Sequence, residues 1–232
     1  MSKLYLIPSS LVDDDVSALP QYVIEAVRNL RCFMVEDEKT VRRFLRKLLP
    51  DFPLQECEWF NLNEHTDRIE TQKFFEASCH KDIGIISEAG CPCVADPGAD
   101  VVLSAHKKGI DVVPLVGPSS ILLALMASGL GGQNFAFVGY LPKDKAERAR
   151  MMKMLEKRSA AEKQTQIFME TPYRNLSLFQ EIVATFAPST MLCVAANLTS
   201  PDQYIKTQNI HAWKKFQPPI DKKPALFLIF AF

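Results

Sequence analysis

The chain has 232 residues, of which 47% are hydrophobic and 23% charged, the proportions of a soluble globular protein. Lysine plus arginine and aspartate plus glutamate number 27 each, which excludes a global positive field that would attract nucleic acid or anionic lipid but leaves room for a local basic patch. The N-terminus shows no signal peptide, and a chain of this length needs no disulfides, so the six cysteines are expected to be reduced and the protein cytoplasmic.

Short apolar runs alternate with helical patterns in the first half of the chain. The runs suited to buried strands are LYLI (4–7), CFMV (32–35), WFNL (59–62), IGIIS (83–87) and VVPLV (112–116). The segments with helical periodicity are 19–30, 38–49, 67–78 and 97–109. In the last of these, Pro97 suits a first helical turn and Gly109 the residue after the helix end. This alternation predicts right-handed crossovers and a mostly parallel sheet.

The pattern changes after Gly117. An uncharged stretch there is cut by Pro114 and a GPSS turn into a strand and a helix of about a dozen residues, too short to span a membrane. Further strands are expected at 135–141, 165–170, 191–197, 203–210 and 225–230, with helices at 145–158 and 174–186. The last three strands are closely spaced, which indicates antiparallel pairing. The prediction is an α/β fold with two α/β domains, residues 1–117 with a mostly parallel sheet and residues 118–232 with a mixed sheet.

Unusual residues gather in the loops that follow the five strands of the first half. These loops read SSLVDDD, EDEKT, NEHTD, SEAGCPCVADPG and GPSS. In parallel sheets, ligands bind outside the carboxyl ends of the strands, so an active site is expected there.

Several motifs admit an ordinary structural interpretation beside the functional one. Cys91-Pro-Cys93 is spaced too closely for a structural zinc site and has no second pair, so no metal is expected. The sequence has no GxGxxG, GxxxxGK[ST] or GxSxG motif. Asp96-Pro97, Ser119 and Ser120 suit helix N-caps as well as ligand contacts. The cations of EDEKTVRRFLRK suit a solvated helix face or contacts to phosphate.

Five motifs, in order along almost the whole chain, resemble those of the tetrapyrrole methylase superfamily, the class III S-adenosylmethionine-dependent methyltransferases. SEAGCPCVADPG is similar to S-D-A-G-x-P-x-x-x-D-P-G, and VVPLVGPSSILLALMASGL is similar to V-x-P-[LI]-P-G-P-S-A-x-x-x-A-L-x-x-S-G-L. LYLIPSS, FAFVGYLP and IFMETPYR resemble three more. The likeness is greatest to the branch of ribosomal small-subunit RNA (cytidine-2′-O)-methyltransferase I, whose usual C-terminal segment does not follow ALFLIFAF here.

The resemblance implies two α/β domains with S-adenosylmethionine in the cleft between them, and a homodimer. Methyl transfer from a sulfonium forms no covalent enzyme intermediate, so catalysis depends mainly on placement. Gly90 lets the backbone approach the ligand closely, and the small side chains of its neighbours leave room for the ligand. By match to the motifs, the implied cofactor residues are Pro8, Ser87, Glu88, Ala89, Gly90, Asp96, Ser119, Ser120, Glu170, Thr171, Leu198 and Ala225.

This sequence departs from the motifs of that branch in segments expected to face the methyl acceptor. A family I-G-N-L is replaced by Leu11-Val12-Asp13-Asp14-Asp15, and A-R-E-L-T-K-x-H-E reads AANLTSPDQ, which removes two cations and a carboxylate. A ribose hydroxyl must lose a proton as it attacks, and carboxylates or a histidine can assist. The candidates are Asp37, Glu88, Glu170 and His65. Of these, Glu88 and Asp37 are the predicted catalytic groups, and Arg43 and Arg174 are predicted to hold anionic substrate.

Three functions remain open at this point. The first is ribose methylation of small-subunit ribosomal RNA, which expects basic residues such as Arg42, Arg43 and Arg46 on one face. The second is methylation of a small molecule such as a tetrapyrrole, which expects a trough lined by Phe60, Phe135 and Tyr140. The third is a protein that binds S-adenosylmethionine but has lost its acceptor site.

Overall fold

The computed structural model describes residues 2–12, 15–63 and 65–232. The chain divides into two compact units, Met1–Ser119 and Ser120–Phe232, so the division lies two residues after the predicted domain boundary. Within the described part of the chain, no helix is long and apolar enough to cross a membrane.

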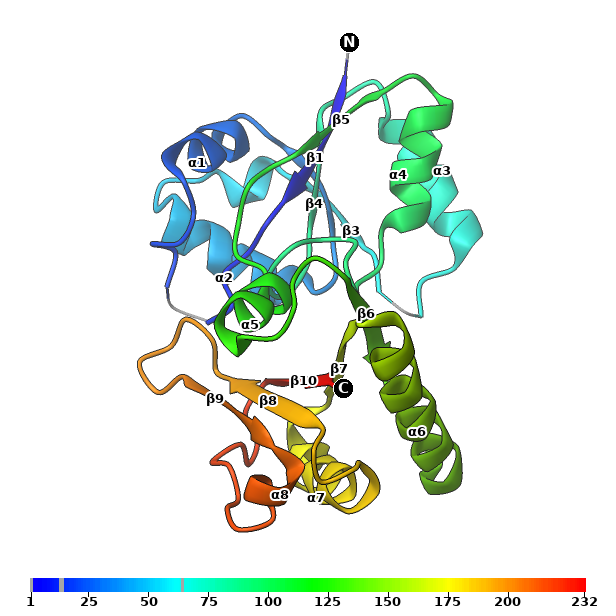
Figure 1. The fold of residues 1–232 in the computed structure, drawn as a ribbon. Coiled ribbons are helices and arrows are strands. Elements are labelled where there is room, and N and C mark those ends of the chain that lie inside the picture. Colours follow the sequence, from blue (N-terminus) through cyan, green and yellow to red (C-terminus); the bar gives the residue numbers. More distant parts are fainter. Residues whose placement is uncertain (1, 13–14, 64) are drawn as a thin grey trace. The chain divides into compact units, whose positions relative to one another are not determined.

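The first unit is a parallel five-stranded sheet with helices on both faces (Figure 1). Its strands are β1 (Lys3–Ile7), β2 (Cys32–Val35), β3 (Glu58–Asn61), β4 (Ile83–Ile86) and β5 (Asp111–Pro114). They are ordered β3-β2-β4-β1-β5, and every neighbouring pair is parallel. The helices are α1 (Gln21–Arg28), α2 (Glu38–Leu48), the short η1 (Leu54–Glu56), α3 (Arg68–Ser78) and α4 (Ala99–Lys107). The predicted parallel sheet is confirmed.

Alternating side chains along each central strand build two cores, one on each face of this sheet. In β2, Phe33 and Val35 pack with the apolar faces of α1 and α2. Cys32 and Met34 point the other way, into the core that α3 and α4 cover. All four β2 side chains are therefore buried, which explains why the strand reads as a continuous apolar run.

The second unit has a mixed five-stranded sheet. Its strands are β6 (Phe135–Tyr140), β7 (Thr165–Glu170), β8 (Met191–Ala196), β9 (Tyr204–Asn209) and β10 (Ala225–Phe230), in the order β6-β7-β10-β8-β9. β6 and β7 are parallel, and the other neighbouring pairs are antiparallel. The predicted mixed sheet with antiparallel last strands is confirmed.

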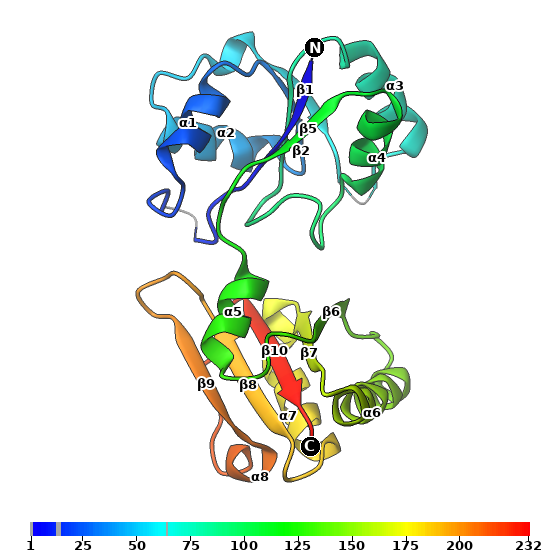
Figure 2. The ribbon, with the colours of Figure 1, turned by 45° about the horizontal axis from the view of Figure 1, so that its top comes forward.

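Helices cover both faces of this second sheet. α5 (Ser120–Ser128) lies across β8, β9 and β10, as Figure 2 shows. The other face carries α6 (Lys145–Glu162), η2 (Pro172–Arg174), α7 (Asn175–Thr185) and α8 (Ile210–Trp213). Trp213, only 1% exposed, packs edge-on against Phe179 in that core.

Two local predictions are wrong. Pro97 is not in the first turn of α4 and Asp96 is not its N-cap, because the helix begins at Ala99 with Gly98 in the capping position. Gly98 has a φ of 124°, a conformation open in practice only to glycine, so the chain turns there and not at the proline. The helix after the GPSS turn has nine residues rather than about a dozen, since it ends at Ser128 before Gly129. Gly109 does follow the end of α4, as predicted.

Candidate active site

The loop after β4 is tied directly to the loop after β1, its neighbour in the sheet. The Ser9 N–H donates to the Gly90 carbonyl at 2.9 Å, and the Gly90 N–H donates to the Ser9 carbonyl at 3.2 Å. The Ser9 hydroxyl also donates to the Ser87 carbonyl at 3.0 Å. These bonds form an isolated antiparallel bridge beyond the ends of the two parallel strands and hold the two loops together at one edge.

The segment after β5 joins them through close backbone contacts. Gly90 has a φ of 78°, and a Cβ there would lie 3.5 Å from the Pro118 carbonyl oxygen. The Cys91 Sγ lies 3.5 Å from the same oxygen. A Cβ on Gly117 would lie 2.2 Å from a ring carbon of Pro8, so only glycine fits at this position. Three loops of the first unit therefore converge around Gly90 and Gly117.

The interior of the long loop is built from small, partly buried polar groups. Burial raises the pKa of the Asp96 carboxyl, and the nearby Ser87 hydroxyl opposes this rise only in part. That hydroxyl is itself buried and makes no hydrogen bond of good geometry within the described residues. Within the described part of the chain, the loop thus holds a buried hydroxyl without a hydrogen-bond partner next to a carboxyl whose ionised form is disfavoured by burial.

The two cysteines of the loop pack rather than react. The Cys93 Sγ lies 2.7 Å from where a Cβ on Gly98 would sit, and it packs against the core beside Ile85. Burial raises the pKa of Cys93 to about 11, so its thiol stays protonated at neutral pH. Across the described ranges, no group of three His, Cys, Asp or Glu side chains could hold a metal ion.

Acidic residues connect this loop to the start of α2. The Glu88 N–H donates to Glu36 Oε2 at 3.2 Å. Asp37 is the N-cap of α2 and accepts from the Thr40 N–H at 2.7 Å. The hydrogen bonds from Thr40 lower the pKa of Asp37, which makes it a weaker base than an unbonded carboxylate. Glu88 and the adjacent Ala89 are exposed at the same edge.

The second unit presents a separate polar edge where β7 ends. Glu170 is buried, and its Oε1 accepts from Arg174 Nη2 at 2.6 Å and from the Thr171 N–H at 2.7 Å. Ala225, the first residue of β10, pairs with Glu170 on one side and with Ala196 on the other. Leu198, two residues after Ala196, is buried. The predicted cofactor residues of the second half, apart from Ser120 in α5, thus lie around one end of this sheet.

The altered loop after β8 is held by its own side chains. The Asp202 carboxylate accepts from Asn197 Nδ2 at 3.1 Å, from Ser200 Oγ at 2.6 Å and from Lys223 Nζ at 2.7 Å. These bonds, with Lys223 as the largest cause, hold the pKa of Asp202 well below its usual range. Asn197 and Thr199 have positive φ angles, so the turn is strained and the network secures it.

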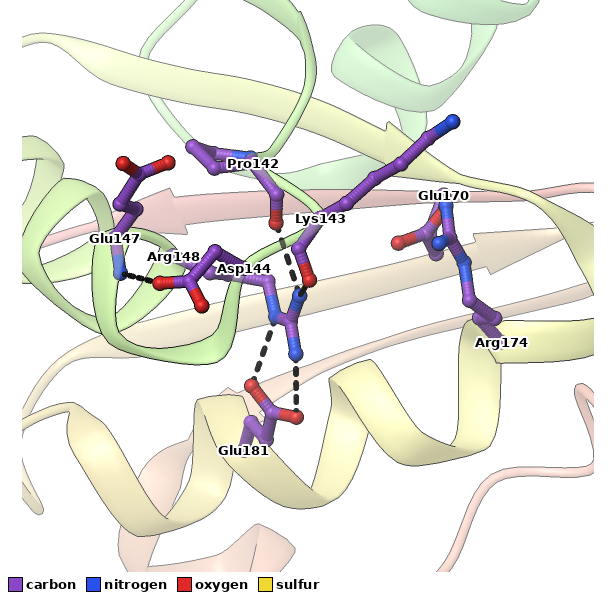
Figure 3. Close-up of polar contacts among 8 residues, drawn as sticks. All are labelled: Pro142, Lys143, Asp144, Glu147, Arg148, Glu170, Arg174 and Glu181. Atoms are coloured by element: carbon purple, nitrogen blue, oxygen red, sulfur yellow. Dashed lines mark hydrogen bonds and ion pairs between the residues drawn. The ribbon is translucent and has the colours of Figure 1, made fainter.

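An ion pair that the sequence did not reveal anchors the loop after β6 (Figure 3). Arg148 binds both carboxylate oxygens of Glu181 at 2.8 Å. Its Nη1 also donates to the carbonyls of Pro142 and Lys143, at 2.9 and 2.8 Å. The two charged side chains are only 12% and 18% exposed. This pair fixes α6, α7 and the loop together, at the same edge of the sheet as Glu170 because β6 and β7 are parallel.

The predicted site residues therefore fall into two groups. In the first unit the structure brings together Pro8, Ser87 and Gly90, with Ser119 directly after Gly117-Pro118, while Arg43 is exposed on α2. Ser120 begins α5, and Arg174 pairs with Glu170 in the second unit. Asp13 and Asp14 lie outside the described residues. The residues missed by sequence reasoning are Ser9, Gly117, Pro118 and Arg148; for Gly117, the signal was its place in the VGPSS motif.

The chain belongs to the family of tetrapyrrole (corrin/porphyrin) methylases, whose family model matches residues 14–212, and it is a methyltransferase of that family. It is 28% identical over 205 residues to "Ribosomal RNA small subunit methyltransferase I" of Vibrio cholerae, covering 88% of this chain and 67% of that protein. It is 27% identical over 230 residues to the protein of the same name from Buchnera aphidicola, covering 97% and 77%. The chain thus spans about two thirds to three quarters of the length of these relatives.

Solved structures share the fold at low sequence identity. Diphthine synthase superimposes with a TM-score of 0.70 at 15% identity, covering 100% of this chain and 90% of that one. Uroporphyrin-III C-methyltransferase from Thermus thermophilus, complexed with S-adenosyl homocysteine, gives a TM-score of 0.56 at 17% identity, covering 99% and 97%. Both support the two-sheet α/β architecture.

Proposed function

We propose that the protein is an S-adenosylmethionine-dependent methyltransferase that methylates a ribose 2′-hydroxyl of small-subunit ribosomal RNA. The observation that carries the proposal is the convergence of the Gly90 loop on Pro8 and on Gly117-Pro118, in a chain of the methylase family. The names of the relatives, which match most of the chain, support the acceptor.

The residues of the first unit fit the cofactor. S-adenosylmethionine supplies the methyl group from a sulfonium cation. The left-handed Gly90 and the absence of a side chain at Gly117 let backbone approach a ligand closely. The Ser87 hydroxyl has hydrogen-bonding capacity left for a ligand. Burial disfavours the ionised form of Asp96, and a cationic ligand within reach offsets that cost.

The proposed cofactor contacts are those that the motif matches imply. The first unit contributes Pro8, Ser87, Glu88, Ala89, Gly90, Asp96 and Ser119. The second contributes Ser120, Glu170, Thr171, Leu198 and Ala225. The Glu170 carboxylate is held in place by two short hydrogen bonds, which it accepts from the Thr171 N–H and from Arg174 Nη2.

The acceptor hydroxyl requires a proton acceptor, for which we propose Glu88 assisted by Asp37. Glu88 is exposed at the loop edge, whereas Asp37 is committed to the α2 cap with a lowered pKa. We therefore assign the main role of proton acceptor to Glu88 because of its exposed position at the loop edge. Arg43 and Arg174 are proposed to hold anionic substrate, as guanidinium groups match phosphate geometry.

The double substitution Glu88→Gln/Asp37→Asn is expected to lower kcat by about 100-fold or more, the usual contribution of general base catalysis. Asparagine is as good an N-cap as aspartate, so α2 should remain folded. Transfer is measured under saturating S-adenosylmethionine, and circular dichroism checks the fold. Unchanged turnover would remove both carboxylates from the mechanism.

Methyl-tritium transfer tests the function itself. The substrates are RNA from a strain deleted for this gene and, in parallel, free tetrapyrroles. Label in a cytidine ribose of small-subunit RNA is the expected result. Label in tetrapyrrole alone would show a small-molecule methyltransferase. Binding of S-adenosylmethionine by calorimetry without transfer to either would show a protein that has lost its acceptor site.

Phe60 is one of the three residues expected to line a trough for a small-molecule acceptor. Phe60 stacks on Phe74 with ring centroids 4.6 Å apart and packs against the core of the first unit. Its neighbours in the expected trough, Phe135 and Tyr140, belong to the second unit and are exposed there. The homodimer implied by the resemblance and the cytoplasmic location expected from the N-terminus and the cysteines stay predictions. Light scattering at several concentrations tests the homodimer.

A further inference from the structure

A groove of about 760 Å³ runs along α2 in the first unit. One wall is the solvent face of α2, and the other includes Leu54 of η1 and Asn61 at the end of the edge strand β3. Five cations of the helix line it: Lys39, Arg42, Arg43, Arg46 and Lys47. By comparison, the pocket between α3 and α4 is lined by two cations, Arg68 and Lys107.

The spacing of these cations places them on one face of the helix. They recur at intervals of three and four residues, the spacing of neighbours on a helix surface. The opposite face carries Val41, Leu45 and Leu48, which are buried in the core. The charged and the apolar side chains of α2 thus lie on opposite faces of the helix.

Two carboxylates line the described part of the groove beside these cations, and each has a local hydrogen-bond partner. The Asp37 carboxylate accepts from the Thr40 N–H at the helix N-terminus. Glu38 Oε1 accepts from Arg42 Nε at 2.7 Å. Among the described residues that line the groove, five are cations and two are carboxylates, and one of the two carboxylates caps the helix.

One guanidinium lies over an aromatic ring. Arg42 lies 4.8 Å from the ring centroid of Trp59. Trp59 in turn stacks on the fully buried Phe33, with centroids 5.1 Å apart. Arg42 is therefore ordered before a ligand arrives, which reduces the entropy lost on binding.

The groove begins at the edge proposed for methyl transfer. Its lining includes Asp37 and Asn61, which lie at the carboxyl ends of β2 and β3. The residue before Asp37 is Glu36, whose carboxylate accepts from the Glu88 N–H at 3.2 Å. A chain lying in the groove would pass directly from the α2 cations to the Glu88 loop.

We infer that this groove binds the sugar-phosphate backbone of the acceptor RNA next to the methylated ribose, an inference that rests on the proposed function. A row of cations on one helix face matches a polymer with one charge per nucleotide. Three of the five cations are arginines, whose planar groups pair with phosphate through two hydrogen bonds. An acidic protein segment could bind the same cations, but its carboxylates do not repeat regularly as the phosphates of RNA do.

The test removes two groove cations that have no proposed catalytic role. Lys39→Gln/Arg46→Gln is compared with Lys73→Gln/Lys107→Gln, which removes two exposed lysines from α3 and α4 on the other face of the same sheet. Binding is measured to small ribosomal subunits assembled on unmodified RNA, and to the naked transcript, over a range of salt concentrations. Calorimetry with S-adenosylmethionine is run on every variant.

The groove variant is expected to bind both RNA probes at least about 10-fold more weakly at 0.1 M salt, with a salt slope reduced by about 1.4, that is 0.7 for each lost phosphate contact. The control variant should match the wild type, and both should keep their S-adenosylmethionine affinity. Wild-type affinity in the groove variant would overturn the inference. So would weaker binding to subunits with unchanged binding to naked RNA, which would assign the groove to a ribosomal protein. Failure of the proposed function is a separate result: the wild type itself would bind neither probe.

Discussion

Gly117→Ala is expected to weaken S-adenosylmethionine binding by about 100-fold. The added Cβ would lie 2.2 Å from a ring carbon of Pro8, whereas ordinary contacts begin at 3.4 Å, so the two segments must separate by more than an ångström. Pro8 cannot move aside as a flexible side chain would, because its ring is part of the backbone and is buried. A misplacement of about 1 Å in a site that works by positioning costs on the order of 100-fold in reaction rate, and we expect a loss of similar size in the affinity for S-adenosylmethionine.

The matched control is Gly131→Ala, where the nearest heavy atom to the new Cβ is 4.0 Å away and no positive φ is involved. It adds the same methyl group without a clash. Calorimetry gives the affinity of each variant, and thermal unfolding gives stability, where overpacking at Gly117 should cost about 1–3 kcal/mol. Wild-type affinity in a folded Gly117→Ala variant would show that the contact between the Pro8 and Gly117 segments is not part of the cofactor site.

The regular elements of the first unit could be predicted because their signals are local. A strand such as CFMV is buried on both faces, so each of its residues is apolar and the run is visible in the sequence. The start of α4 was not predictable in this way. Proline is favoured in a first helical turn, but the φ of 124° at Gly98 overrides that preference and delays the helix by two residues.

The candidate site could be predicted only in part, because most of its contacts join residues that are far apart in the sequence. The Gly90 loop carries a dense motif, so its role could be inferred before its contacts were known. The hydrogen-bond network around Asp202 could not be inferred in this way. In the sequence, each departure from the family motif there appears only as the loss of a charged residue. Only the structure shows that Asn197, Ser200 and Lys223 all donate to that carboxylate. Arg148 and Glu181 are likewise 33 residues apart, and no sequence pattern joins them.

That ion pair gives the largest expected effect on stability. Arg148→Met is expected to destabilise the second unit by about 3 kcal/mol, because it leaves the mostly buried Glu181 carboxylate without its partner. Each unit contains a single tryptophan, Trp59 in the first and Trp213 in the core of the second. In a Trp59→Phe background, tryptophan fluorescence therefore comes only from the second unit. Urea unfolding followed by Trp213 fluorescence therefore reports on the right half of the chain.

The double variant Arg148→Met/Glu181→Leu distinguishes the buried charge from the loop contacts. An apolar pair of similar volume removes the unpaired carboxylate, so much of the stability should return. The remaining deficit measures the two bonds from Arg148 to the carbonyls of Pro142 and Lys143. Equal stability of the single and double variants would mean that Glu181 finds another partner and that the ion pair is not what holds the loop.

The pH dependence of the same variants checks the sign of the interaction. The Arg148 guanidinium lowers the pKa of Glu181 below its ordinary value of 4.5. The pair therefore stabilises the fold fully above pH 4.5, and this contribution is lost as the pH falls through the lowered pKa. In Arg148→Met the buried carboxylate is instead easier to protonate, so acid relieves its cost. The stability gap between wild type and Arg148→Met should consequently narrow below pH 4.5, whereas a gap that is constant with pH would place the effect in packing rather than in charge.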